Sequence, residues 1–138
     1  MFFKQISVFL ENKAGRLADI TGVLAGGGID IKALSIADTN DFGILRLIVD
    51  RPADALSALK ASGFMVRETP VVGLKIDHKP GGLHRVLKLM EEYGIFIEYM
   101  YDLLSADTSD TATIIAKLAN QDEAVETMKK LGADFITG

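Results

Sequence analysis

Cysteine is absent from this chain of 138 residues, and histidine occurs only twice. The absence of cysteine excludes disulfides, thiolate metal sites and a cysteine nucleophile, and it fits a reducing compartment. His78 and His84 have no third histidine and no carboxylate at helical ligand spacing to complete a metal site. We therefore expect neither a bound metal nor another cofactor.

Long apolar runs and clusters of basic charge are missing as well. No apolar stretch approaches the roughly 18–20 residues that span a bilayer, and residues 1–5 lack the basic start of a signal peptide. The 15 basic residues are scattered among 19 acidic ones, which gives a net charge of −4. Such a surface repels nucleic-acid backbones. We expect a cytoplasmic protein that binds neither nucleic acid nor membrane.

The sequence also lacks the motifs of common enzyme classes. No Gly-x-Ser-x-Gly nucleophile motif is present. The glycines at 26–28 follow an apolar helical segment and are not accompanied by Gly-Lys-Ser/Thr, unlike those of a phosphate-binding loop. Glu91 and Glu92 would point in different directions around a helix, which is typical of a solvated face. Because the sequence assembles no acid–base pair, we expect a protein without catalytic activity.

What the chain does contain is an internal repeat. The segment Glu11–Leu17, ENKAGRL, returns 66 positions later as DHKPGGL at 77–83. Each copy then runs through an apolar segment to Gly-Ile-x-Ile, at 28–31 and 94–97. A second block aligns after a three-residue slip, so that the following residues coincide: Ala55, Lys60 and Gly63 with Ala124, Lys129 and Gly132. Internal repetition outranks any local motif because it fixes the architecture.

The repeat predicts two modules, residues 1–69 and 70–138, with Pro70 at the boundary and almost no linker. With 49% hydrophobic and 25% charged residues, the composition is that of an ordinary globular protein. A core built from about 69 residues is only marginally stable by itself. The copies should therefore pack on each other, on a second chain, or on both.

Hydrophobic periodicity predicts the order β-α-β-β-α-β in the first copy. Alternation over residues 2–10 predicts a strand, and apolar residues at three- and four-residue spacing from Leu17 to Leu24 predict a helix. The other predicted elements are strands at 29–37 and 42–49 with a turn at 38–41, a helix from Asp50-Arg51-Pro52 to Gly63, and a strand at 64–69.

The second copy repeats this order. Its predicted elements are a strand at 72–76, a helix at 83–93, strands at 95–103 and 112–118 connected through 105–110, a helix at 122–131 and a strand at 133–137. Such a unit makes a four-stranded antiparallel sheet with both helices on one face. We therefore predict an α+β fold of two ferredoxin-like modules.

The sheet face opposite the helices is predicted to be apolar rather than polar. The residues assigned to this face are Phe9, Leu34, Ile36, Ile44 and Ile48 in the first copy, and Phe96, Met100 and Ile115 in the second. So many apolar side chains on one face indicate a covered surface. We expect a second sheet to pack there, from another chain of a homodimer.

The repeated motif resembles the ACT domain. In both copies an acidic residue closes the first strand, a Pro/Ala-Gly turn follows, a leucine opens the helix, and Gly-Ile-x-Ile opens the second strand. The resemblance covers essentially the whole chain, which is thus similar to a stand-alone tandem ACT protein. It implies that the protein binds a small molecule, most often an amino acid, and regulates a partner enzyme.

The resemblance also implies ligand sites where two modules join edge to edge through their second strands. There, the first strand–helix loop of one module faces the start of the second strand of its neighbour. In the pocket that we favour, Asp30 and Ile31 face the loop His78, Lys79, Pro80, Gly81, Gly82 and Leu83. A helix N-terminus attracts a carboxylate, and Asp30 could hold the ammonium of the ligand.

The second implied pocket joins Phe96 and Tyr99 to the loop Asn12, Lys13, Ala14, Gly15, Arg16 and Leu17. Arg16 could clamp a carboxylate through a bidentate pair. Phe96, however, replaces the polar residue of the strand, so this pocket is either degenerate or specific for a more apolar ligand.

Simpler interpretations stay open for the same residues. Gly15 and Gly81 could serve only to make tight turns, Asp30 could be a solvated strand residue, and Lys13 and Arg16 could be ordinary surface charges. Two other functions also stay open. One is a regulatory subunit that docks without a ligand, for example on an acetolactate-synthase-like enzyme, and the other is a small ferredoxin-like enzyme.

Overall fold

The computed structural model describes residues 2–11, 13–38, 42–103 and 110–136. The chain divides into two units, each with its own core. Lys4–Thr69 form one unit, called module one below. Pro70–Gly138, together with the first residues of the chain up to Phe3, form the other, called module two.

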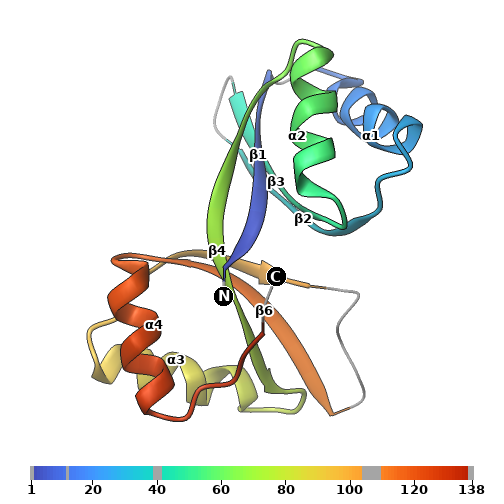
Figure 1. Cartoon of the computed structure of the whole chain (residues 1–138). Helices are drawn as coiled ribbons and strands as arrows, with labels where there is room; N and C mark the ends of the chain where they lie inside the picture. The colour runs from blue at the N-terminus through green and yellow to red at the C-terminus, as the bar shows by residue number, and fades with distance from the viewer. Residues whose placement is uncertain (1, 12, 39–41, 104–109, 137–138) are drawn as a thin grey trace. The chain divides into compact units, whose positions relative to one another are not determined.

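Module one has the predicted order of elements. They are β1 (Phe3–Glu11), α1 (Arg16–Gly26), β2 (Ile31–Asp38), β3 (Phe42–Val49), α2 (Pro52–Ala61) and the first part of β4 (Met65–Asp77). β3 pairs antiparallel with both β1 and β2, and the strand order within the module is β2-β3-β1-β4. Both helices cover the same face of this sheet (Figure 1).

The core of module one lies between its sheet and its two helices. The alternating residues Ile6 and Val8 of β1 are fully buried, as are Ile20 of α1 and Leu59 of α2. Phe64, which follows α2, packs against this cluster while partly exposed. Each fully buried large apolar side chain contributes about 1.5–3 kcal/mol to folding, so these contacts fix the helices on the sheet.

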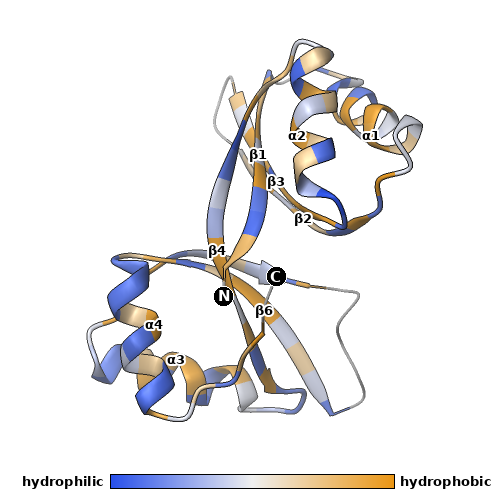
Figure 2. Cartoon of the chain, in the orientation of Figure 1, coloured by the Kyte–Doolittle hydropathy of each residue, from blue (hydrophilic) through white to orange (hydrophobic). Residues whose placement is uncertain are grey.

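Module two repeats the architecture. Its elements are the rest of β4, α3 (Gly82–Glu92), β5 (Ile97–Asp102), β6 (Thr111–Leu118), α4 (Gln121–Lys130) and β7 (Phe135–Ile136). β6 pairs antiparallel with β4 and β5, and β7 pairs with β4. Hydrophilic and hydrophobic residues alternate along α4 in Figure 2, and its apolar residues Ala124, Val125 and Met128 are buried in the core.

The two strands predicted on either side of Pro70 form one continuous strand, β4. Proline has no backbone N–H to donate to a neighbouring strand, which is why it is confined to certain positions of a sheet. Its carbonyl oxygen is satisfied by a side chain, because Gln121 Nε2 donates to it at 2.9 Å. Pro70 therefore does not interrupt the strand.

The helix predicted to start at Asp50-Arg51-Pro52 begins at Pro52, with Asp50 near its N-terminus. Arg51, not Asp50, occupies the N-cap of α2, and no side chain of the described residues caps this helix. The Asp50 carboxylate instead accepts a hydrogen bond of 2.9 Å from the backbone N–H of Asp30. The predicted turn at 38–41 and the connection at 105–110 lie outside the described residues, except for Asp38 and Asp110.

The prediction of an apolar helix-free face is wrong for several residues. Leu34 pairs with Leu47 and Ile36 with Leu45, so both lie on the face that the helices cover. Met100 likewise packs against the core of module two. The physical reason is a register irregularity early in β2 and another early in β5. An extra residue in a strand inverts the alternation of all the residues that follow it.

Three apolar residues of module one do form an exposed cluster on the helix-free face. Phe9 pairs with Ile44 across the strands, and the Phe9 and Phe42 rings lie 4.9 Å apart. These three side chains are 38–44% exposed. Ile48, in contrast, is 3% exposed, and Ile115 of module two is fully buried. Apart from Leu34 and Ile36, the predicted residues that are exposed are Phe9 and Ile44, at one end of the sheet of module one, and Phe96 of module two.

Candidate ligand-binding loops and an interior hollow

The loops that open the first helix of each module have the same backbone geometry. Gly15 and Gly81 are the N-cap residues of α1 and α3, with φ of 88° and 87°. A Cβ at either position would meet no atom within 4 Å, but this left-handed conformation strains any other residue. No side chain of the described residues caps either helix. Both loops thus leave a helix N-terminus open to an anionic group.

The loop of module one is held by charge pairs. Lys13 Nζ lies 2.9 Å from Glu11 Oε2, and Arg16 Nη1 lies 3.7 Å from Asp19 Oδ2. The hydrogen bond from Lys13, and next its positive charge, hold the pKa of the Glu11 carboxyl below its ordinary value. Both cations of this loop therefore already have carboxylate partners. Ala14 and Leu17 are exposed, and Asn12 lies outside the described residues.

The loop of module two borders a cavity of about 490 Å³. The predicted site residues that line it are His78, Lys79, Pro80 and Leu83, and the cavity extends to Asp102 and Ile114. The backbone N–H of His78 donates to the Asp110 carbonyl at 2.8 Å, which fixes the start of the loop. A volume of this size is within the range of small-molecule sites.

Gly82 has a structural role that the sequence did not reveal. It is buried, and a Cβ at this position would overlap the backbone carbonyl oxygen of Asp77. Glycine is therefore required for the close approach of α3 to the end of β4. The aligned residue of module one, Arg16, has no such neighbour constraint, so the two loops differ in how tightly they pack.

The strand residues predicted to complete the two pockets lie at corresponding places. Asp30 directly precedes β2, its side chain is 67% exposed, and its Oδ2 lies 3.0 Å from Lys32 Nζ. Phe96 directly precedes β5 and is 67% exposed. Tyr99 is placed inside β5, where its ring stacks on that of Tyr101 at 6.5 Å. Asp30 is the one of these side chains with a charge to offer an ammonium group.

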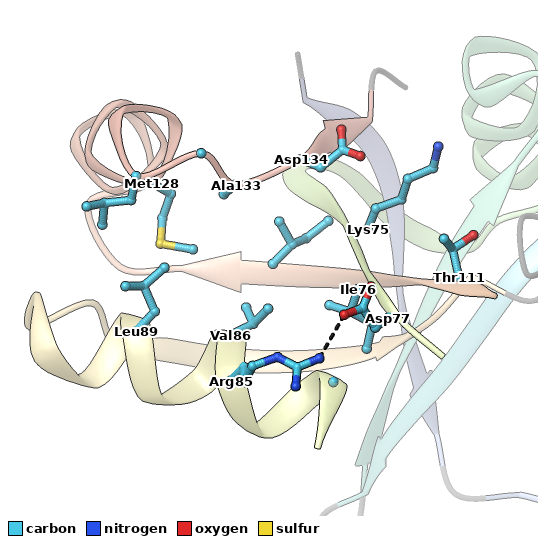
Figure 3. A pocket seen from close by; sticks show the side chains of 14 residues that line it. Lys75, Ile76, Asp77, Arg85, Val86, Leu89, Thr111, Met128, Ala133 and Asp134 are labelled. Carbon is cyan, nitrogen blue, oxygen red and sulfur yellow. Dashed lines mark hydrogen bonds and ion pairs between the residues drawn. The ribbon is translucent and has the colours of Figure 1, made fainter. Parts of the chain in front are cut away.

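A second cavity of module two was not predicted from the sequence. It measures about 320 Å³ and lies between α3, α4 and β4. Figure 3 shows its apolar residues Val86, Leu89 and Met128, and Arg85 reaching toward Asp77. Arg85 Nη2 and Asp77 Oδ2 are 2.7 Å apart. A comparison of the two copies could have indicated it, because Ala133 stands where the first copy has Phe64.

Metal and membrane sites were also assessed within the ranges that the structure describes. No three His, Asp or Glu residues in these ranges are grouped so that they could hold a metal ion. None of the helices there is long and apolar enough to cross a membrane.

Comparisons with known proteins agree with this architecture. The profile of a family described as an ACT domain pair matches residues 1–138. The crystal structure of protein BT0572 from Bacteroides thetaiotaomicron is 43% identical, with a TM-score of 0.90, over 99% of this chain and 92% of that one. No curated protein matches the chain.

Two structures with lower identity share the fold. The ligand-free regulatory subunit of aspartate kinase from Thermus thermophilus has a TM-score of 0.67 at 16% identity, over 94% of this chain and 93% of that one. The corresponding subunit from Thermus flavus has a TM-score of 0.61 at 19% identity, with 88% and 86% covered. The predicted α+β fold is confirmed, and the residues that the structure describes form four helices and antiparallel strands.

Proposed function

The chain belongs to the family of ACT domain pairs, and from that premise we propose that it is a non-catalytic regulatory protein. It binds an amino acid at the seam between ACT modules and thereby modulates a partner enzyme in the cytoplasm. The Thermus proteins that share the fold are regulatory subunits of aspartate kinase. By analogy with them we propose an enzyme as the partner of this chain as well.

The observation that carries this proposal is the cavity beside the loop of module two. The loop combines an open helix N-terminus, an exposed glycine at Gly81 and a hollow of about 490 Å³. In the proposal, the ligand carboxylate binds at the start of α3, where unpaired N–H groups and the helix dipole favour negative charge. Asp30 of a neighbouring module then accepts the ligand ammonium.

The same proposal includes a homodimer that forms through β2. This strand lies at the end of the strand order of module one, and an edge strand offers unpaired backbone groups to another chain. Its side chains Leu34 and Ile36 are 49% and 47% exposed. A ligand that binds one arrangement of the modules better than another would shift affinity for the partner enzyme.

A second candidate is a regulatory subunit that docks on its enzyme without a ligand of its own. The exposed cluster of Phe9, Phe42 and Ile44 favours it, because apolar side chains gathered on one surface often mark a protein interface. The two candidates differ in whether an amino acid stabilises the free protein.

A thermal-shift screen of the twenty amino acids tests the proposal. A ligand at 100 times its Kd stabilises the folded state by about 2.7 kcal/mol, which raises the Tm by roughly 5–10 °C. We expect one or a few amino acids to give such a rise and Asp30→Ala to abolish it. Asp54→Ala is the matched control, because Asp54 is also exposed and paired with one cation, Arg51 Nη1, at 3.2 Å.

Each result has a defined meaning. A rise that survives in Asp30→Ala would contradict the assignment of the pocket. A flat response to all twenty amino acids, together with a stable complex with an enzyme, would favour the docking subunit instead.

A further inference from the structure

We propose that module two holds a second small-molecule site in its interior, between α3 and α4, for an α-amino acid with an apolar side chain. The site is the 320 Å³ hollow of Figure 3. It lies within module two and needs no neighbouring module, although Ile76 and Asp77 also line the cavity on which the proposed function rests.

The inner part of the hollow is apolar. Leu74 of β4 forms part of it, Val86 and Leu89 contribute from α3, Met128 from α4, and Ala133 from the turn after α4. All five belong to the core cluster of module two or pack against it. Val86 and Leu89 are partly exposed and available to a ligand, whereas Leu74 and Met128 are buried.

Two positions beside the hollow carry smaller side chains in module two than in module one. Phe64 packs against the core of module one, whereas its counterpart in module two is Ala133. Ile20 is fully buried, whereas its counterpart Val86 is only partly buried. Two other lining residues are larger than their counterparts, Leu89 against Val23 and Leu131 against Ser62, so these exchanges reshape the space between the helices.

Module one has a hollow of the same volume but with a different lining. Its hollow at the corresponding end is also about 320 Å³. It is lined by Phe9, Phe42 and Phe64 and by residues around them, but not by the core residues Ile20, Val23 and Leu59. The hollow of module one therefore lies outside the helix pair, and that of module two reaches inside it.

Charges of both signs stand at the mouth of the hollow in module two. Asp77 and Arg85 line it, pair at 2.7 Å, and each side chain is 57% exposed. The aligned residues of module one, Glu11 and Asp19, are both acidic. Module two has thus replaced one acid by a base in the first turn of α3, which contains no acidic residue.

This charge pair is complementary to the zwitterion of an amino acid. Arg85 carries N–H donors beyond the one that Asp77 accepts, and a guanidinium binds a carboxylate well. Asp77 can accept from the ligand ammonium while the apolar side chain of the ligand extends toward Val86 and Leu89. Lys75 and Asp134 also border the hollow, but in Figure 3 their charged ends point away from Val86 and Leu89.

Size narrows the ligand class further. A volume of about 320 Å³ is at the lower end of small-molecule sites, which fits a single amino acid rather than a nucleotide. An apolar interior leaves any polar side chain of the ligand without hydrogen-bond partners. Amino acids with branched aliphatic side chains match both the interior and the mouth.

The experiment follows the methionine methyl groups of the full chain by NMR after 13C labelling. Met128 lines the interior hollow, and Met65 of module one lines the other, so Met65 is an internal control. On titration with L-leucine we expect a saturable shift of the Met128 signal and no change at Met65. The 2-oxo acid analogue, 4-methyl-2-oxopentanoate, should bind roughly tenfold more weakly, because it lacks the ammonium that would donate a hydrogen bond to Asp77.

Variants distinguish ligand binding in this hollow from ligand binding at the seam between modules. Ala133→Phe, which copies module one, should abolish the Met128 response, whereas Asp30→Ala should leave it unchanged. Arg85→Gln should weaken leucine binding roughly tenfold, and Arg51→Gln, an exposed arginine of module one, should have no effect. Circular dichroism checks that each variant is folded.

Two outcomes would overturn the proposal. One is a Met128 signal that does not move in the unmodified protein at millimolar leucine. The other is a response that persists unchanged in both Ala133→Phe and Arg85→Gln. Either result leaves the seam proposal standing, since that proposal is tested by the Asp30-dependent rise in Tm.

Discussion

Module one and module two share their element order and the backbone of their helix-opening loops, but they differ in what fills the space between the two helices. In module one Phe64 lines a hollow that does not reach Ile20 or Val23, whereas in module two the aligned Ala133 borders a hollow that also reaches Val86 and Leu89. The loops differ in the same way, since Arg16 of one copy is replaced by the buried Gly82 of the other. Backbone geometry is thus kept by both copies, while side-chain volume and charge have diverged.

The largest expected effect on the free energy of unfolding comes from exchanging Phe64 and Ala133, the aligned residues that border the two hollows. Phe64→Ala should cost about 2–4 kcal/mol of unfolding free energy, because it removes a partly buried ring and opens a hollow. The reciprocal Ala133→Phe should change stability by less than about 1 kcal/mol, because the ring enters existing space. Urea unfolding measures both. Equal effects of the two substitutions would show that the interiors do not differ as described.

The next effect concerns the close approach of α3 to β4. Gly82→Ala should destabilise the protein by about 1–3 kcal/mol, because the added Cβ overlaps the Asp77 carbonyl oxygen, which is fixed backbone. The matched change in module one, Arg16→Ala, should stay within about 0.5 kcal/mol. Chemical denaturation compares the two variants. If Gly82→Ala destabilised the protein no more than Arg16→Ala, the close approach of α3 to β4 would be contradicted.

A smaller effect should be the same in both modules. Gly15→Ala and Gly81→Ala should each cost about 1–2 kcal/mol, because both residues have positive φ and neither has a neighbour that a Cβ would touch. The comparison is between the two variants, measured by thermal unfolding. A clear difference between them would mean that the loops are not equivalent in backbone geometry after all.

The fold could be predicted from the sequence because the repeat and the hydrophobic periodicity agree at every element. The side of the sheet on which each side chain of β2 and β5 lies could not be predicted. A single register irregularity after Ile31 or Ile97 inverts the alternation, and the amino-acid composition gives no sign of it. Leu34 and Ile36 were for this reason assigned to the wrong face. The hydrogen bond from Gln121 to the Pro70 carbonyl oxygen within the continuous strand β4 joins residues far apart in the sequence and could not be predicted either.

Of the candidate sites, the loops could be predicted and the interior hollow could not. The loops follow from a short motif that is local in sequence, at Gly15 and Gly81. The hollow depends on the absence of a ring at Ala133, which becomes visible only when the register of the repeat and the packing of the helices are both known. Small residues opposite large ones in an aligned repeat are therefore a signal for such hollows.

The smallest expected effect concerns the charges of the loop in module one. Because Lys13 holds the pKa of Glu11 below its ordinary value in the folded protein, this carboxylate adds stability above its unfolded pKa, and that stability is lost as the pH falls through the folded pKa. An NMR titration of Glu11 should show the lowered pKa, and Lys13→Ala should raise it toward the ordinary value of a glutamate. Arg16→Ala should raise it less, because Arg16 acts only through charge at longer range. An equal rise in both variants would mean that the Lys13 hydrogen bond does not set the pKa.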